Sequence, residues 1–337
     1  MSNKVAQKRP LHVPVWLAFC LAMTGGASAA IQAVVNGELG EALGSALSAG
    51  VVSNSVGTFV FLIAMCCVPS MRAGFVRTFR QGLPWWMFCG GLFGAAFAFM
   101  GAYATPLVGI AIFTIGHVCG NTLGGLGTDS VGLGPSGRIR LTGFRFVGAA
   151  LAVAAVSVTQ LGHATDTQQW WLAPLIVAVG AGVAVQGALN GRLNDSVHSP
   201  MSTGFINFLV GTIVLYAVMS GVLLGGQVSL GTFPSQPWLY VGGICGAIVV
   251  LTTLLAVKSL GVFRLGLGVL TGQLSGALVL DVVATGTWPS LQMALGVALT
   301  VAAVLVASMS GRRDKGMPVE AEPIVGVHNS PDDPPRG

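Results

Sequence analysis

Apolar runs long enough to cross a lipid bilayer follow one another along almost the whole chain. An α-helix needs about 20 mostly apolar residues to span the hydrocarbon core of a bilayer. Charged residues make up only 8% of this sequence, whereas soluble domains carry about 25%. A chain with so few charged groups cannot cover a water-soluble globule, and the sequence therefore predicts an all-α polytopic membrane protein.

The apolar runs predict ten transmembrane helices in two sets of five. The first five are expected at residues 13–36, 44–68, 84–104, 106–128 and 141–161, and the second five at residues 170–190, 200–224, 237–257, 261–284 and 287–308. Residues 1–12 are expected to form a cytoplasmic N-terminus. Residues 309–337 are rich in Pro, Glu and Asp without apolar periodicity, which predicts a disordered cytoplasmic tail.

A polar motif within this apolar sequence occurs twice, and the two copies lie 154 residues apart, with Gln32 matching Gln186. The first copy reads Gln32-Ala-Val-Val-Asn36-Gly-Glu-Leu, and the second reads Gln186-Gly-Ala-Leu-Asn190-Gly-Arg-Leu. Each copy lies toward the end of an apolar run. Such a repetition indicates that the chain contains an internal duplication.

The duplication continues beyond the motif. After a deletion of two residues, which changes the offset to 152, Gly109 matches Gly261 and Asp129 matches Asp281. Residues 13–161 and 170–308 are therefore two copies of one five-helix unit. Because five is an odd number of crossings, the copies must insert with opposite orientation, which predicts two inverted repeats with a substrate site between them at the bilayer midplane.

The net charge of +5 indicates membrane topology and not nucleic-acid binding, because the basic residues fall into alternate connecting segments. Cytoplasmic loops of membrane proteins carry an excess of Lys and Arg. With the N-terminus in the cytoplasm, the outer loops contain no basic residue, and Glu38 and Glu41 lie outside. The sequence therefore predicts that the N- and C-termini are both cytoplasmic.

Three polar side chains near the middle of the fourth and ninth spans are candidates for a substrate site: His117, Asn121 and Gln273. Polar groups at the bilayer centre are costly and usually face a cavity or a partner helix. Interhelical hydrogen bonding is the alternative for each of them. Asn54 and Asn207, in the paired second and seventh spans, either line the same path or serve helix packing.

The two copies of the duplicated motif are expected at opposite mouths of the transport path. Gln32 and Asn36 share one helix face at the outer end of the first span, and Gln186 and Asn190 lie at the inner end of the sixth. Such a pair of sites is suited to act as gates. The alternative for both asparagines is a helix stop, because Asn-Gly commonly ends a helix.

Two aspartates lie at the C-terminal ends of spans, Asp281 at the outer end of the ninth and Asp129 at the inner end of the fourth. The helix macrodipole disfavours a negative charge there, so another group should compensate for it. Proton coupling is one interpretation of this pair. The other is that both are interfacial carboxylates that reach water beside the lipid headgroups.

The Gln-x-x-x-Asn-Gly-x-Leu motif, followed by Gly-Thr in the next span, resembles the YdcZ-type branch of the drug/metabolite transporter superfamily. The resemblance covers the chain from about Val13 to Ser308 in a fused, two-copy form. It implies a ten-helix bacterial inner-membrane secondary transporter that exports a small metabolite or drug-like molecule. Separately from the resemblance, we expect no cofactor and leave a homodimer open.

Other classes of function leave fewer traces in the sequence. A passive channel or a membrane scaffold without transport turnover remains an alternative to a carrier. An intramembrane enzyme is disfavoured, because His117 and Cys119 lie about 200° apart around their helix and cannot form a dyad. The sequence predicts no catalytic residues and no metal site, and its expected partners are a small-molecule substrate and the lipid bilayer.

Overall fold

The computed structural model describes residues 13–161, 169–225, 232–286 and 288–313, and all regular structure within them is helical. The predicted cytoplasmic N-terminus and most of the predicted disordered tail lie outside the described residues. The helices are α1 (Val15–Leu43), α2 (Ala46–Cys67), α3 (Pro69–Arg80), α4 (Gly90–Val131), α5 (Gly143–Thr159), α6 (Ala173–Val197), α7 (Pro200–Leu224), α8 (Gly242–Thr285) and α9 (Leu291–Arg313). Short 3-10 turns precede three of them, η1 (Trp85–Cys89), η2 (Trp170–Leu172) and η3 (Pro237–Tyr240).

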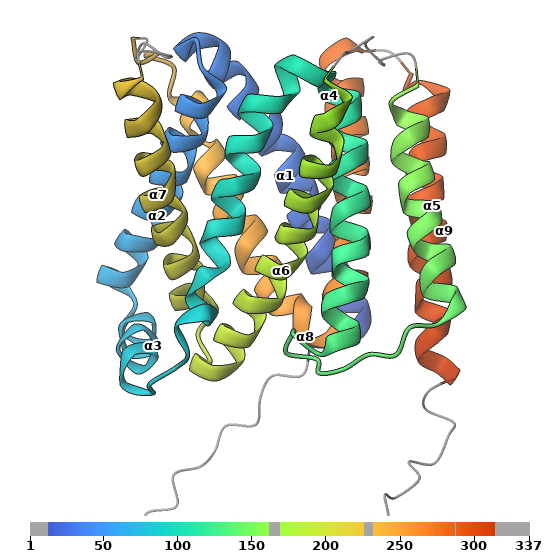
Figure 1. Cartoon of the computed structure of the whole chain (residues 1–337), viewed down its shortest axis with the longest axis horizontal. Helices are drawn as coiled ribbons and strands as arrows, with labels where there is room; N and C mark the ends of the chain where they lie inside the picture. Colours follow the sequence, from blue (N-terminus) through green and yellow to red (C-terminus); the bar gives the residue numbers. More distant parts are fainter. Residues whose placement is uncertain (1–12, 162–168, 226–231, 287, 314–337) are drawn as a thin grey trace, which may run out of the picture.

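The long helices run side by side in one bundle (Figure 1). Six helical stretches of the described chain are long and apolar enough to cross a membrane, and shorter apolar helices lie at Trp85–Gly101 and Gly143–Thr159. The beginning of α1, the end of α9 and the short helix α3 all lie at the lower edge of the bundle in Figure 1. The fold is therefore that of a multi-pass helical membrane protein.

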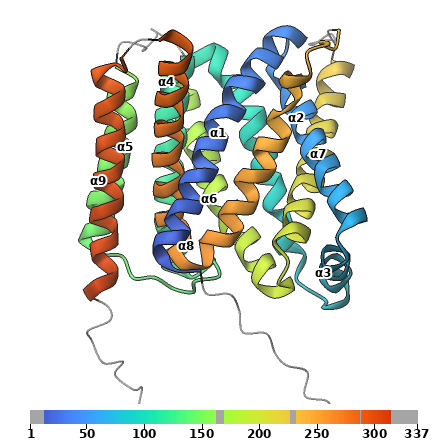
Figure 2. The same cartoon turned by 180° about the vertical axis from the view of Figure 1, so that it is seen from behind.

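Helices α4 and α8 each contain one glycine at which the chain reverses direction. Gly109 in α4 has φ 80°, and Gly261 in α8 has φ 76°, a left-handed conformation that only glycine adopts without strain. Figures 1 and 2 show α4 turning back at the upper edge of the bundle and α8 turning back at the lower edge. Each helix therefore supplies two antiparallel arms, which correspond to two of the predicted spans.

The interpretation of Asn36 and Asn190 as helix stops is wrong. Helix α1 continues past Asn36 to Leu43 and ends at Gly44, which has φ 66°. Helix α6 continues past Asn190 to Val197. Both asparagines therefore lie in helix interiors. Their side chains pack against glycines of other helices, as described below, and these contacts outweigh the local tendency of Asn-Gly to end a helix.

Equivalent serines begin the second helix of each copy. Ser45 caps α2 by accepting a hydrogen bond from the backbone N–H of Ser48, and Ser199, 154 residues later, caps α7 in the same way through Ser202. A serine hydroxyl at this position satisfies one of the four unpaired N–H groups of a helix start. The same N-capping serine thus begins the second helix after the short connections α1–α2 and α6–α7.

Helix α3 lies in a segment where the sequence analysis expected only a connecting loop. Pro69 occupies its first turn, and Arg77 and Arg80 occupy its last turn, where positive charge is favoured by the helix dipole. The helix packs against α7, and the hydroxyl of Ser202 donates a 2.8 Å hydrogen bond to the carbonyl oxygen of Met71. Phe79 of this helix is exposed. Twelve residues are too few to form a span, so α3 runs along the lower edge of the bundle.

The two halves of the chain interlock, because helices of each half pack mainly against helices of the other. Helix α1 packs against α8, α6 against α4, α5 against α9 and α2 against α7. Figure 2 shows α1 crossing in front of the returning arm of α8. The hydrophobic core is accordingly shared between the halves and is not divided into two domains.

Glycines let the interlocked helices touch backbone to backbone. A Cβ atom on Gly120 of α4 would lie 1.9 Å from the carbonyl oxygen of Val177 in α6. A Cβ atom on Gly272 of α8 would lie 2.0 Å from the carbonyl oxygen of Met23 in α1. Such contacts are a main source of helix association in a membrane. Lipid tails are as apolar as the helix surfaces, so helices gain little from the hydrophobic effect and associate through close packing.

We expect Gly120→Ala to destabilise the fold, because its methyl group cannot fit against Val177. Overpacking of this kind costs about 1–3 kcal/mol. The matched control is Gly127→Ala in the same helix, where no atom lies within 4 Å of the added Cβ. Thermal unfolding in detergent should show a lower midpoint for Gly120→Ala only. Equal midpoints for the two variants would contradict the close approach of α4 and α6.

Candidate functional site

A cavity of about 160 Å³ lies between α4, α6 and the two arms of α8. Its polar lining consists of Asn121, Gln186, Asn190 and Thr253, and the rest is glycine and aliphatic side chains, chiefly valine and leucine. Among the described residues that line it, none is charged. The cavity is thus a neutral, partly polar chamber inside an apolar bundle.

The cavity extends from the middle of the bundle toward its lower edge. Asn121 lies near the middle of the returning arm of α4, whereas Val257 and Val262 flank Gly261, where α8 turns back at the lower edge (Figure 1). Asn190 lies at the same end, seven residues before the end of α6. The polar groups therefore lie between the middle of the bundle and the edge where α3 lies.

A hydrogen-bonded network holds two of the lining amides. The side-chain amide nitrogens of Gln186 and Asn190 both donate to Oδ1 of Asn207 in α7, at 3.0 and 2.8 Å. Gln186 and Asn190 are four residues apart and share one face of α6. Because Asn207 is buried, this double contact fixes the orientation of both amides against α7.

The structure brings one predicted substrate-site residue together with two predicted gate residues. Asn121 lines the cavity, and so do Gln186 and Asn190. Gln273 and His117 are not among the residues that line it. Depth along a helix can be read from sequence, but the face that a side chain occupies depends on packing, which explains this difference.

His117 belongs to an aromatic cluster one helical turn from Asn121, toward the upper edge of the bundle. Its ring centroid lies 4.5 Å from that of Phe97 and 6.4 Å from that of Phe113. Its Nε2 atom is buried and forms no hydrogen bond with any residue that the structure describes. Phe97 and Phe113 had no role in the sequence analysis, because phenylalanine in an apolar span gives no functional signal.

The first copy of the duplicated motif packs like the second but lacks its hydrogen bonds. Asn36 lies against Gly242 as Asn190 lies against Gly90, each oxygen 2.1 Å from the position of a Cβ on that glycine. The residue equivalent to Asn207 is Ser53. In the described part of the chain, Asn36 Oδ1 and Ser53 Oγ are buried without a hydrogen-bond partner.

Asn54 serves helix packing and does not line the cavity. Its side-chain amide donates to the carbonyl oxygen of Phe208 at 3.1 Å and to the hydroxyl of Thr212 at 2.8 Å, which ties α2 to α7. Of the two asparagines considered for the path, only Asn207 therefore contacts residues of the cavity.

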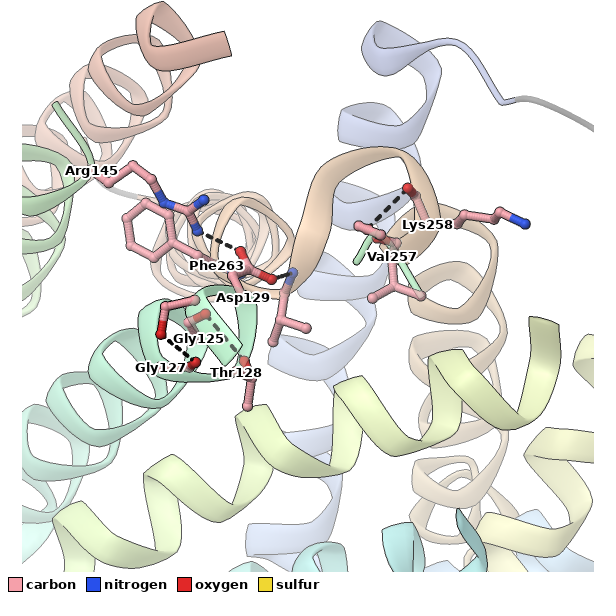
Figure 3. Close-up of polar contacts among 11 residues, drawn as sticks. Gly125, Gly127, Thr128, Asp129, Arg145, Val257, Lys258 and Phe263 are labelled. Carbon is pink, nitrogen blue, oxygen red and sulfur yellow. Dashed lines mark hydrogen bonds and ion pairs between the residues drawn. The ribbon is translucent and has the colours of Figure 1, made fainter. Parts of the chain in front are cut away.

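Asp129 is a buried structural anchor at the end of α4. Its two carboxylate oxygens accept hydrogen bonds from the backbone N–H groups of Val262 and Phe263, at 2.8 and 3.2 Å, and the same carboxylate pairs with Arg145 of α5 (Figure 3). The guanidinium of Arg145 also lies 4.9 Å from the ring centroid of Phe263. These groups compensate the carboxylate against the dipole of α4, as the sequence analysis required.

The interpretation of Asp129 as an interfacial carboxylate that reaches water is wrong, because only 1% of this residue is exposed. Its carboxylate caps the first N–H groups of the returning arm of α8, directly after the turn at Gly261. Asp281, the equivalent residue near the end of α8, is exposed. A lone arginine in the first turn of an apolar helix was the sequence signal that could have identified Arg145 as the partner of Asp129.

A multi-pass bundle of apolar helices that encloses a neutral polar cavity has the architecture of a membrane transporter. The family described as "Putative inner membrane exporter, YdcZ" matches residues 17–158 and again residues 171–309. The chain belongs to this family and contains two copies of its unit. It is accordingly a multi-pass inner-membrane protein, and its class is that of a transporter and not of an enzyme.

Comparison with proteins of known structure supports the fold alone. One solved crystal structure is 21% identical in sequence and superposes with a TM-score of 0.65, over 89% of this chain and 98% of its own. No curated protein sequence matches the chain.

We expect Arg145→Gln to be strongly destabilising, because it leaves the carboxylate of Asp129 buried without its charged partner. Removing one member of a buried ion pair costs about 3–5 kcal/mol. Lys258→Gln is the matched control, since its pair with Asp195 is about two-fifths exposed and such pairs contribute less than about 1 kcal/mol. Thermal unfolding in detergent measures both, and similar midpoints for the two variants would refute the anchoring role.

Proposed function

We propose that the chain is a secondary exporter of small uncharged molecules, which works by alternating access between two inverted five-helix halves. The observation that carries this proposal is the neutral cavity lined by Asn121, Gln186 and Asn190. These residues come from both halves of the chain. A site built in this way changes whenever the halves move relative to each other.

Contacts repeated between the halves support the inverted repeat and its ten spans. Gln32 lies against Gly246 as Gln186 lies against Gly94, which are equivalent contacts with the halves exchanged. In Figure 1 α1 runs upward and α6 runs downward, and α4 and α8 turn back at opposite edges.

A contact between equivalent residues supports the same arrangement. The hydroxyls of Thr58 and Thr212, 154 residues apart, lie 2.8 Å from each other. Two equivalent groups that touch each other lie beside the axis that relates the halves. This axis passes between α2 and α7.

The charge distribution supports a cytoplasmic lower edge. The basic residues at this edge include Arg77 and Arg80 on α3, Arg138 and Arg140 before α5, and Lys258 near the turn of α8. By the positive-inside rule we expect this edge, where the described chain begins and ends, to face the cytoplasm. The cavity lies toward that edge, and hydrogen bonds from the hydroxyl of Ser136 to the carbonyl oxygens of Val257 and Lys258 tie the α4–α5 connection to α8 at its lower end.

The lining of the cavity supports an uncharged substrate. A charged molecule in an apolar bundle loses its hydration and needs a charged partner, and the described lining offers none. Amides of Asn121, Gln186 and Asn190 provide hydrogen bonds, and the valines and leucines provide apolar contact. A small molecule with a few polar groups on an apolar frame fits this combination.

A passive channel is less well supported than a carrier, because the cavity extends toward one edge and an aromatic cluster lies beyond it. Nothing in the described structure favours a scaffold. Participation of Asp281 in proton coupling and formation of a homodimer stay predictions. Asp129 is a poor candidate for coupling, because Arg145 and two backbone N–H groups already occupy its carboxylate.

The transport prediction is tested first by comparing the metabolites released by cells with and without the protein. We expect the compounds released only by the expressing cells to be uncharged at neutral pH. Gln186→Leu should then lower their release about tenfold, which corresponds to the loss of one or two hydrogen bonds in the cavity. Gln160→Leu, at the end of α5, is the matched control and should transport normally. Release of charged compounds alone would overturn the proposed substrate class.

The topology prediction is tested with reporters. Green fluorescent protein fused after Gly337 should fluoresce, and alkaline phosphatase at the same position should be inactive, because the C-terminus is cytoplasmic. Alkaline phosphatase fused after Ser290, between α8 and α9, should be active. An active phosphatase at Gly337 would remove the basis for the inverted repeat.

A further inference from the structure

Helix α3 carries three arginines and no acidic residue. Arg72, Arg77 and Arg80 are all exposed. None of them forms an ion pair with a residue that the structure describes. The twelve residues of this helix therefore hold three positive charges without a counter-charge of their own.

The acidic residues of the described chain do not balance these charges. At the lower edge, Asp129 and Asp195 are each already paired with a basic residue. Glu38, Glu41 and Asp281 lie near the ends of α1 and α8, at the opposite edge of the bundle (Figure 1). The counter-charge for α3 must come from outside the described residues.

Exposed apolar side chains lie beside the arginines. Val76 follows Arg72 by four residues and precedes Arg80 by four, so these three share one exposed face of α3. Phe79 is 65% exposed, and Trp85, in the turn η1 that follows, is 78% exposed. Basic side chains together with exposed Phe and Trp are typical of helices that lie in the plane of a membrane interface.

The other face of α3 is fixed to the bundle. Met71, Gly74 and Thr78 are buried. A Cβ atom on Gly74 would lie 2.5 Å from the Cβ atom of Ser199, and the hydroxyl of Ser202 is bonded to the carbonyl oxygen of Met71. Helix α3 is thus held against the start of α7, and its basic face stays at the edge of the bundle (Figure 1).

We propose that α3 is an interfacial helix whose three arginines bind the phosphate groups of anionic phospholipids, while Phe79 and Trp85 insert among the acyl chains. Lipid surrounds every membrane protein, and the negative headgroups of an anionic lipid complement the unbalanced charge of α3. None of the residues that line the cavity belongs to α3, so this surface is separate from the proposed substrate site. The leaflet that supplies the lipid is the cytoplasmic one, which rests on the proposed topology.

Lipid binding by the purified full chain tests this inference. Phosphatidylglycerol, which is anionic, and phosphatidylcholine, which has no net charge, are added with identical acyl chains to the protein in a non-ionic detergent. Native mass spectrometry then measures the Kd of each lipid. We expect phosphatidylglycerol to bind at least about tenfold more tightly, since each arginine beside an anionic headgroup strengthens binding about fivefold. Inorganic phosphate, added alone as a competitor, should not displace the lipid.

Removing the charge of α3 should abolish this preference. The combination Arg72→Gln, Arg77→Gln and Arg80→Gln should weaken phosphatidylglycerol binding at least about tenfold and leave phosphatidylcholine binding unchanged. The matched control removes three exposed basic residues elsewhere at the same edge, by the combination of Arg138→Gln, Arg140→Gln and Lys258→Gln. The control should keep the preference. Should either combination fail to fold, Arg80→Gln is compared with Arg138→Gln, and only the first should weaken binding, about fivefold.

The apolar contribution has its own matched pair. Phe79 and Phe233 are each 65% exposed, but Phe233 precedes η3 at the opposite edge of the bundle. Phe79→Ser should weaken phosphatidylglycerol binding at least about threefold, because the ring no longer contacts the acyl chains, and Phe233→Ser should have no effect.

Several outcomes would overturn the inference. Equal Kd values for the two lipids, or equal losses in the α3 combination and its control, would show that α3 has no specific role in lipid binding. Displacement by inorganic phosphate would identify a site for the free anion instead, and an unchanged Kd in Phe79→Ser would exclude insertion of the ring. The measurement needs neither a substrate nor transport. Transport without a lipid preference removes this inference alone, and a lipid preference without transport removes only the proposed export.

Discussion

Backbone-to-backbone contact at glycines is the interaction on which this fold depends. In lipid, helices gain little from hiding apolar surface, so association requires close packing over a long contact. Gly120 and Gly272 provide it by admitting the carbonyl oxygens of Val177 and Met23, and each contact joins one half of the chain to the other. The halves therefore cannot separate into independent domains. The cavity lies where α4, α6 and the two arms of α8 meet.

The turn at Gly261 depends on the anchor at Asp129. The chain can reverse within one residue only because glycine accepts φ 76°, and the N–H groups that the turn leaves unpaired need an acceptor. The carboxylate of Asp129 supplies that acceptor, and Arg145 balances its charge. The charges of Asp129 and Arg145 are thus paired with each other within the scaffold. The residues that line the neighbouring cavity are uncharged, and this is the basis on which we propose an uncharged substrate.

Duplication alone would give two equal half-sites, and this chain departs from equality at a few positions. Asn207 in one half corresponds to Ser53 in the other, so one pair of amides is hydrogen-bonded and the other is not. Three rings in α4 correspond to three aliphatic side chains in α8. The scaffold is shared, and these differences make the two halves chemically unequal. A transporter with unequal sides can bind its substrate more strongly on one side of the membrane than on the other.

The sequence by itself determined the class of protein, the helical architecture, the duplication and the side with the positive charge. These follow from hydropathy, residue identity and spacing, which need no knowledge of neighbours.

The sequence also marked Asn121, Gln186 and Asn190 as polar groups of interest. The sequence analysis assigned these residues to different roles, because neither segment by itself shows that α4 and α6 pack against each other. It also ended α1 and α6 too early, because an Asn-Gly pair carries a local signal that contacts with Gly242 and Gly90 override. Only the tertiary structure decided which polar residues share one cavity, which aspartate is buried, and that Phe97 and Phe113 pack against His117. The physical reason is that each of these depends on which helix faces meet, and in this bundle glycine contacts between distant segments set those faces.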